Sequence, residues 1–130
     1  MDEGDLQRFL DARGIDAEII HLGRKTKTVE QAAVALQTSK DKIIKTVTFI
    51  DGSGEPVLAI VTGEDTVNPK KLAEAIDTIG VRMATSTEVE RHSGYSVGGV
   101  PPIGHKGNIR TVIDMKVMRK KFVYGGGGSD

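Results

Sequence analysis

The chain has 130 residues, which is the size of one domain, and its 18 basic and 18 acidic residues leave no net charge. This balance argues against a protein that coats long nucleic acid through bulk charge, although it does not exclude contact with one RNA end. The absence of cysteine excludes disulfides, thiolate nucleophiles and cysteine metal sites, and it fits a cytoplasmic protein.

Helices and strands are predicted to alternate in the first third of the chain. Apolar residues at helical spacing predict a helix over 2–13 that ends at Gly14, and alternation of apolar residues predicts a strand over 15–22. A Thr-x-x-Gln capping box predicts a helix over 28–37. Ser39 is then expected to cap a short helical turn.

The middle of the chain predicts a β-hairpin. Residues 43–50 are β-branched, aromatic and apolar, an Asp-Gly-Ser-Gly turn follows, and 56–62 reads as the returning strand. The remaining expected elements are a helix over 68–76 that begins with Asn-Pro, a strand over 81–84, a helix over 85–92, a strand over 109–113, a helical turn over 114–119 and a strand over 121–124. This irregular alternation predicts an α/β (α+β) single domain with a mixed sheet and flanking helices.

Charge is distributed unevenly along the chain. Residues 1–23 carry six acids and two bases, a net −4, whereas residues 106–130 carry six bases and two acids, a net +4. The second segment predicts either a basic face or an ordinary solvated rim. The acidic N-terminus lacks the apolar region of a signal peptide, and no apolar stretch is long enough to span a membrane, so no membrane association is expected.

A loop rich in glycine and proline spans 94–107. It holds five glycines and two prolines in fourteen residues, a density that neither a helix nor a central strand tolerates. Its backbone N–H groups could face an anion or a developing oxyanion. A plain surface connection is the alternative.

Lys45 interrupts the apolar alternation of the strand over 43–50. A lysine in this position either extends along the edge of the sheet or points into a pocket, where it would supply a fixed positive charge. Residue pattern alone leaves both readings open.

Other familiar site patterns do not occur in the sequence. His21, His92 and His105 lack metal-ligand spacing, so no metal site is expected, and His105 in the glycine loop either contacts substrate or is solvated. There is no Gly-x-Ser-x-Gly, no P-loop and no dinucleotide fingerprint. Two tyrosines, three phenylalanines and no tryptophan argue against an aromatic platform for single strands.

Six features follow one another in the chain: the strand over 43–50 with its lysine, the Asp-Gly turn, 57–63, Lys71 with Leu72, the Gly-x-x-x-Pro loop within 98–104, and 124–129 with its four glycines. In this order they resemble the YbaK/ProX aminoacyl-tRNA deacylase family. That family includes the editing (INS) domain of bacterial prolyl-tRNA synthetase and its free-standing relatives. The resemblance runs from about residue 26 to the end.

The resemblance implies a twisted mixed sheet and hydrolysis of the ester that joins a mischarged amino acid to the 3′-terminal adenosine of tRNA, without a cofactor. It implies catalytic roles for Lys45, Gly98, Gly99, Val100, Pro101 and Pro102. It implies substrate contacts for Thr46, Ile103, Gly104, His105, Gly126, Gly127, Gly128 and Ser129. The lysine would hold the terminal phosphate or ribose, and the loop would present backbone groups to the ester and the attacking water.

Members of this family continue beyond the glycine turn, whereas this chain ends at Asp130. We therefore expect one editing domain over 1–130 that lacks the C-terminal segment of the family and has a glycine-rich end over 125–130. That end also has the composition of a flexible linker. Expected partners are the aminoacyl-adenosine end of tRNA and an aminoacyl-tRNA synthetase, not DNA, and the protein is expected to be a monomer or a homodimer.

The leading functional interpretation is a trans-editing hydrolase that removes a small amino acid from the wrong tRNA. Alanine on proline tRNA is the first choice, and serine, cysteine and threonine are alternatives that pocket volume would decide. A module that binds aminoacyl-tRNA or a nucleotide, or docks on a synthetase, without hydrolysis is the second interpretation. An unrelated α/β domain with an ordinary glycine loop is the third.

Overall fold

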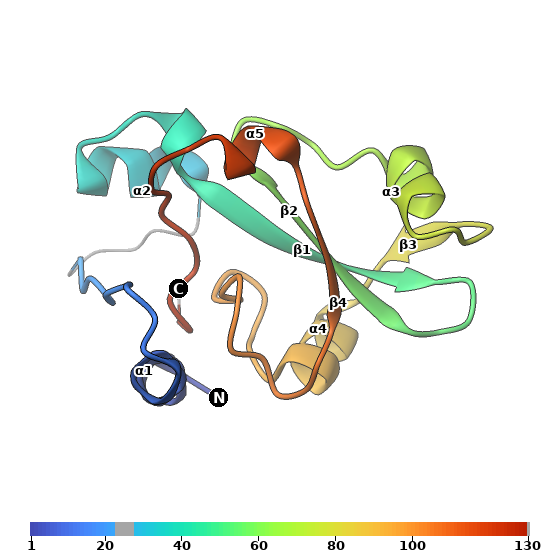
Figure 1. Ribbon diagram of the computed structural model, residues 1–130, viewed down its shortest axis with the longest axis horizontal. Coiled ribbons are helices and arrows are strands. Elements are labelled where there is room, and N and C mark those ends of the chain that lie inside the picture. The colour runs from blue at the N-terminus through green and yellow to red at the C-terminus, as the bar shows by residue number, and fades with distance from the viewer. Residues whose placement is uncertain (23–27, 130) are drawn as a thin grey trace.

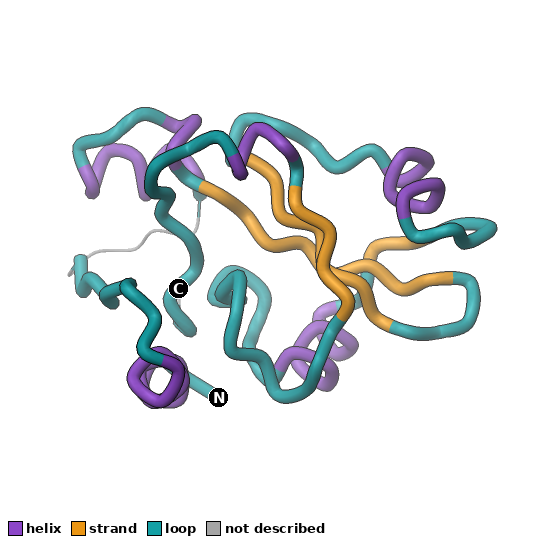
Figure 2. The backbone as a smooth tube through the Cα atoms, viewed as in Figure 1, coloured by secondary structure: helices purple, strands orange, loops and turns teal. Residues whose placement is uncertain are grey.

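The computed structural model describes residues 1–22 and 28–129. Four strands form one sheet in the order β3-β1-β2-β4 (Figure 1). β1 runs antiparallel to β2 and β3, while β4 pairs parallel to β2, so the sheet is mixed as predicted. The strands span Ile44–Asp51 (β1), Pro56–Thr62 (β2), Val81–Met83 (β3) and Arg110–Ile113 (β4). Figure 2 shows the strands crossing one another at an angle, as in a twisted sheet.

Helices flank this sheet. In the described part of the chain they are α1 (Glu3–Arg13), α2 (Val29–Leu36), the short 3₁₀ helix η1 (Lys40–Lys42), α3 (Pro69–Ala75), α4 (Ser86–Ser93) and α5 (Met115–Met118). Asp2, Thr28 and Thr85 each begin a helix with a complete capping box, which satisfies N–H groups that have no partner inside the helix. None of the helices within the described ranges is long and apolar enough to cross a membrane.

The two faces of the sheet carry different apolar clusters. Phe49, Val57 and Ala59 pack with Leu72 of α3 on one face. Side chains alternate along a strand, so Ile44 and Ile60 lie on the other face, where Val117 of α5 covers them. A third cluster of Val89, Tyr95 and Val100 joins α4 to the glycine loop. The loop is thus part of the packed structure.

Two predicted strands are wrong. Residues 15–22 pair with no strand of the described sheet, and Ile15 and Ile20 stay exposed, so the alternating apolar side chains of this segment do not cover a face of the sheet. Residues 121–124 do not form a strand either. Only Tyr124 makes an isolated parallel bridge to Ile43, so the ladder that defines a strand is missing. Ser39 precedes η1 as expected, but its side chain makes no capping hydrogen bond.

Candidate functional site

The glycine–proline loop is closed at its base by buried hydrogen bonds. α4 ends at Gly94, whose φ of 87° is left-handed backbone that suits glycine. The buried Ser93 hydroxyl donates to the carbonyl of Val89 at 2.6 Å and accepts from the Tyr95 N–H at 3.0 Å. Across the loop, the Lys106 N–H donates to the Ser93 carbonyl at 2.8 Å. These bonds fix both ends of the loop.

The C-terminal glycines pack directly on this loop. The Gly128 N–H donates to the Gly99 carbonyl at 2.9 Å. A Cβ on Gly126 would lie 2.4 Å from the Val100 carbonyl oxygen, and one on Gly99 would lie 3.0 Å from the backbone of Ser129. The two backbones therefore approach as closely as they do only because no side chain stands between them. Here the structure brings together the predicted loop residues and the predicted glycine-rich end.

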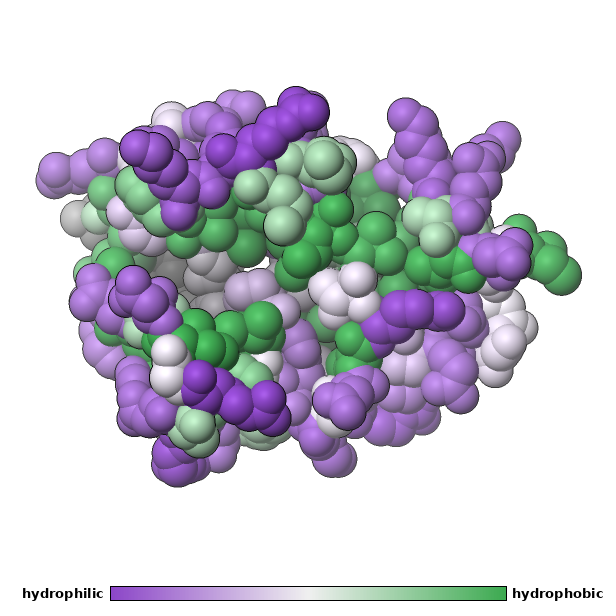
Figure 3. All heavy atoms as spheres, in the orientation of Figure 1, coloured by the Kyte–Doolittle hydropathy of each residue, from purple (hydrophilic) through white to green (hydrophobic). Residues whose placement is uncertain are grey.

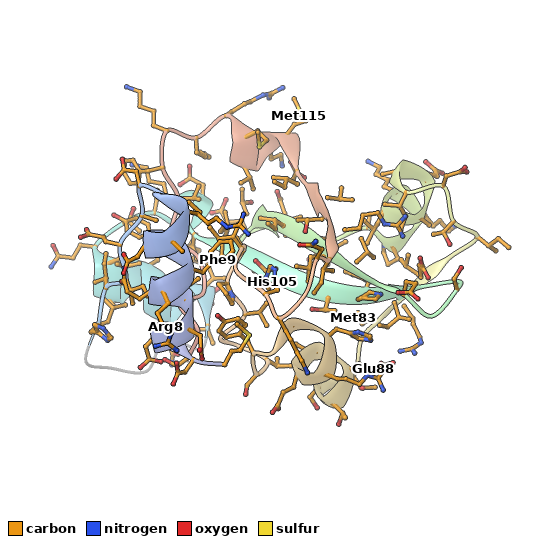
Figure 4. The ribbon with its side chains drawn as sticks, turned by 60° about the horizontal axis from the view of Figure 1, so that its bottom comes forward. Arg8, Phe9, Met83, Glu88, His105 and Met115 are labelled. Atoms are coloured by element: carbon orange, nitrogen blue, oxygen red, sulfur yellow. The ribbon has the colours of Figure 1, made fainter. Side chains whose placement is uncertain are left out.

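α1 forms a wall beside the loop and the C-terminal glycines. The space next to Gly104 is occupied by Phe9, whose Cδ1 lies 3.1 Å from the position of a Cβ, and the space next to Gly128 by the backbone of Glu3. Figure 4 shows Phe9 on α1 and His105 on the loop in the same region of the molecule. Nothing in residues 3–13 predicted that α1 belongs to the site, because their apolar spacing indicates only a packed face.

His105 fixes the conformation of the loop from inside. Its Nε2 lies 2.7 Å from the Pro101 carbonyl oxygen. A carbonyl oxygen only accepts, so Nε2 carries the proton and donates. Burial lowers the pKa of His105 from its ordinary value of 6.5, while the bond to Pro101 opposes that effect. At neutral pH the ring is therefore uncharged.

Two threonine hydroxyls lie buried on the face of β1 that carries Ile44. The Oγ1 atoms of Thr46 and Thr48 have no hydrogen-bond partner among the described residues. Ile44 itself lies 3.3 Å from the position of a Cβ on Gly125, so this face of the strand adjoins the C-terminal glycines. The Thr46 hydroxyl is thus a buried polar group without a partner among the described residues.

Lys45 stands apart from these contacts. Strand alternation directs it from β1 to the face of Phe49, opposite to Ile44. The pKa of Asp65 lies below its ordinary value mainly because Lys116 hydrogen-bonds to it, and the nearby charge of Lys45 adds a smaller effect. Within residues 1–22 and 28–129, no hydrogen bond or ion pair joins Lys45 to the glycine loop.

An aminoacyl-tRNA editing domain model matches residues 24–130, which is most of the chain. This chain belongs to the aminoacyl-tRNA editing domain family. The resemblance to YbaK/ProX editing proteins is thereby confirmed, and α1 lies outside the matched stretch.

Related sequences and structures agree with this assignment. Proline–tRNA ligase of Streptococcus suis is 32% identical over 104 residues, which are 80% of this chain but 17% of the ligase. Proline–tRNA ligase of Geobacter metallireducens is 33% identical over 105 residues, with 80% and 18% covered. The chain therefore spans less than a fifth of these relatives.

Two crystal structures share the fold over nearly the whole chain. The hypothetical protein APE2540 has a TM-score of 0.89 at 34% identity and covers 95% of this chain and 82% of its own. A proposed trans-editing enzyme for prolyl tRNA synthetase has a TM-score of 0.89 at 27% identity, with 98% and 80% covered. The predicted YbaK-like fold is confirmed.

The editing domain offers mainly backbone groups for chemistry. The N–H groups of Gly98 and Val100 have no hydrogen-bond partner among the described residues, whereas Pro101 and Pro102 have no N–H to donate. No group of three potential metal ligands occurs in the described ranges. Preorganised N–H donors of this kind can stabilise an oxyanion.

Sequence reasoning missed an open cavity of about 300 Å³ beside α5. Its lining residues are Asp41, Thr62, Glu64, Asp65, Lys116, Arg119 and Lys120. Lys120 forms an ion pair with Asp41 at 2.7 Å, and Lys116 forms one with Asp65 at 3.1 Å. Asp41 precedes β1 and Asp65 follows β2, so two carboxylates at the open end of the hairpin bind two lysines in and after α5. The +4 charge of residues 106–130 was the available signal.

Proposed function

We propose that this editing domain is a deacylase that hydrolyses the ester of a small amino acid wrongly attached to tRNA. Alanine on proline tRNA is the first candidate, and serine, cysteine or threonine are the others. The relation to proline–tRNA ligases and to a proposed trans-editing enzyme supports action on proline tRNA in trans. The partners would be the aminoacyl-adenosine end of tRNA and a prolyl-tRNA synthetase.

The reaction consumes one water. Water adds to the ester carbonyl, the carbonyl oxygen becomes an oxyanion, and collapse of this intermediate releases the free amino acid and the 3′-terminal ribose hydroxyl. An aminoacyl ester is already reactive, so positioning and oxyanion stabilisation can supply the needed rate. The single observation that carries the proposal is the packing of the glycine loop against the C-terminal glycines, with the Gly128 N–H bonded to the Gly99 carbonyl.

Individual residues have distinct parts in this mechanism. The N–H of Val100 or Gly98 would donate to the oxyanion, and His105 would hold the Pro101 carbonyl in place beside it. Thr46 is half-buried, and its side chain would border the ribose or the amino acid. Ile103 would border the amino-acid pocket, since it is partly exposed within the loop.

Lys45 would supply the positive charge that holds the terminal phosphate or ribose. The pKa values of Glu30 and Asp65 are lowered mainly by a backbone hydrogen bond at Glu30 and by the Lys116 hydrogen bond at Asp65, and the charge of Lys45 adds a smaller effect to both. The role depends on the long lysine side chain reaching substrate from the Phe49 face of β1.

The direct test is a panel of purified aminoacyl-tRNAs. Wild-type protein is expected to hydrolyse alanine from proline tRNA, or else one of the three other small amino acids, and to leave prolyl-tRNA intact. Release of the amino acid is followed over time against the rate without protein. Folded protein that hydrolyses no member of the panel would overturn the deacylase proposal.

A binding module without hydrolysis is the second candidate. The observation in its favour is the position of Lys45, which leaves β1 on the face opposite to Ile44 and the glycine segment. Binding of a non-hydrolysable aminoacyl-adenosine analogue, together with no turnover of the panel, would support this candidate.

A further inference from the structure

The segment that follows α5 carries an exposed aromatic ring beside the proposed site. Phe122 keeps 54% of its surface exposed, although large apolar side chains are usually covered. Its ring lies edge-to-face with Tyr124, with centroids 5.8 Å apart, and the Lys42 ammonium lies 5.1 Å from its centroid. The ring is thus held in position by two neighbours while much of it stays open.

Backbone contacts fix this segment against the sheet. The Tyr124 N–H donates to the Lys42 carbonyl at 2.9 Å, and the Ile44 N–H donates to the Tyr124 carbonyl at 2.8 Å. Figure 1 shows the chain descending from α5 past the start of β1 toward α1. The next residue, Gly125, adjoins Pro102 of the glycine loop, at 3.2 Å from the position of a Cβ. The ring therefore lies three residues along the chain from Gly125, where the glycine-rich end meets the loop.

Basic residues precede the ring in the chain, and one more contacts it. Arg119 and Lys121 are exposed, and neither forms an ion pair with a described residue. Lys42 adds a third cation, through its contact with Phe122. Figure 3 shows strongly hydrophilic side chains next to hydrophobic ones over α5. An exposed ring with one cation in contact and two exposed basic residues within three positions of it in the chain matches the chemistry of a single nucleic-acid strand, in which bases stack and phosphates carry charge.

We infer that Phe122, with Lys42, Arg119 and Lys121, binds the unpaired nucleotides that precede the 3′-terminal adenosine of an RNA. Phe122 stacks on one base and the three cations contact the neighbouring phosphates. The inference rests on the proposed function for the placement of the terminal ester in the glycine loop. Composition argued against an aromatic platform because the chain has so few rings, but one exposed ring suffices for one base.

The test uses a fluorescently labelled single-stranded RNA that ends in CCA and carries no amino acid. Hydrolysis therefore does not enter the measurement. Phe122→Ala is expected to weaken binding about tenfold, as measured by fluorescence anisotropy. Phe122→Tyr is expected to bind as tightly as wild type, since both rings stack. Ile79→Ala is the matched control, because Ile79 is fully exposed outside this surface. Lys121→Ala is expected to reduce the dependence of affinity on salt concentration.

Two outcomes overturn the inference: wild-type protein that does not bind the RNA, or Phe122→Ala protein that binds as tightly as wild type. A second readout separates this inference from the proposed function. Phe122→Ala should raise KM for aminoacyl-tRNA and leave hydrolysis of a short aminoacyl-adenosine ester unchanged. Binding that depends on Phe122 in a protein that hydrolyses nothing would keep the inference and refute the deacylase.

Discussion

At the scale of single residues, the candidate site depends on glycines, because their lack of a side chain lets two backbones come close together. Gly126 and Gly80, a glycine outside the predicted site, have opposite surroundings. A Cβ at Gly126 would lie 2.4 Å from the Val100 carbonyl oxygen, whereas a Cβ at Gly80 would meet nothing within 4 Å. Neither residue has the positive φ that would strain a substitution by itself. The pair therefore separates the effect of the close approach from that of losing a glycine.

Gly126→Ala is expected to push the C-terminal glycines away from the loop and to lower kcat/KM for deacylation about 100-fold, the size of effect that a shift of about 1 Å can have. Gly80→Ala should stay close to wild type. Single-turnover hydrolysis of the preferred aminoacyl-tRNA measures both. Equal activity of the two variants would show that the loop–glycine contact does not shape the site.

His105 is a positioning residue in this account, because it acts through the Pro101 carbonyl. His105→Ala removes one hydrogen bond of about 1 kcal/mol and is expected to lower kcat about fivefold while KM changes little. The exposed His21 provides the control variant His21→Ala. A changed KM with an unchanged kcat would mean that His105 binds substrate and does not shape the loop.

At the scale of elements, α4 supports the loop and depends on Glu88. This carboxylate accepts from the Thr85 N–H at 2.9 Å and binds Arg82 through two bonds of 2.8 and 2.9 Å. The hydrogen bonds from Arg82, and then that from Thr85, lower the pKa of Glu88 from 4.5 to about 2. A lowered folded-state pKa means that the carboxylate stabilises the fold above pH 4.5 and loses this effect as the pH falls toward 2.

Glu88→Gln is therefore expected to lower the urea midpoint of unfolding at pH 7, with a difference from wild type that shrinks between pH 4.5 and about 2. Glu90→Gln, an exposed position on the same helix, is the control. A difference that stays constant over this range would assign the effect to packing.

Elements with local signals could be predicted from the sequence, and elements that depend on distant partners could not. The β1–β2 hairpin follows from its apolar strands and its Asp-Gly turn, and the helix caps at Thr28 and Thr85 from their spacing. Residues 15–22 have the alternation of a strand but find no partner. Alternation indicates that a segment could join a sheet, whereas pairing depends on the rest of the chain.

At the scale of the whole molecule, the candidate site joins three parts of the chain. The loop, the C-terminal glycines and α1 are far apart in sequence, yet Gly99 bonds to Gly128, and Glu3 packs on Gly128. The glycine-rich composition of 125–128 suggested a linker as readily as a site. Only the resemblance to an editing family predicted that these glycines share a site with the loop. No pattern in residues 3–13 predicted that α1 lies beside them.

If Lys45 and the glycine loop serve one hydrolytic site, the rate of deacylation must fall in the Lys45→Ala variant. Lys70→Ala, which removes an exposed lysine of α3, is the control. Lys45→Ala is expected to lower the single-turnover rate about 100-fold or more, with the fold intact, while Lys70→Ala hydrolyses the ester like wild type. A Lys45→Ala protein that is as active as wild type would contradict a role for Lys45 in that site.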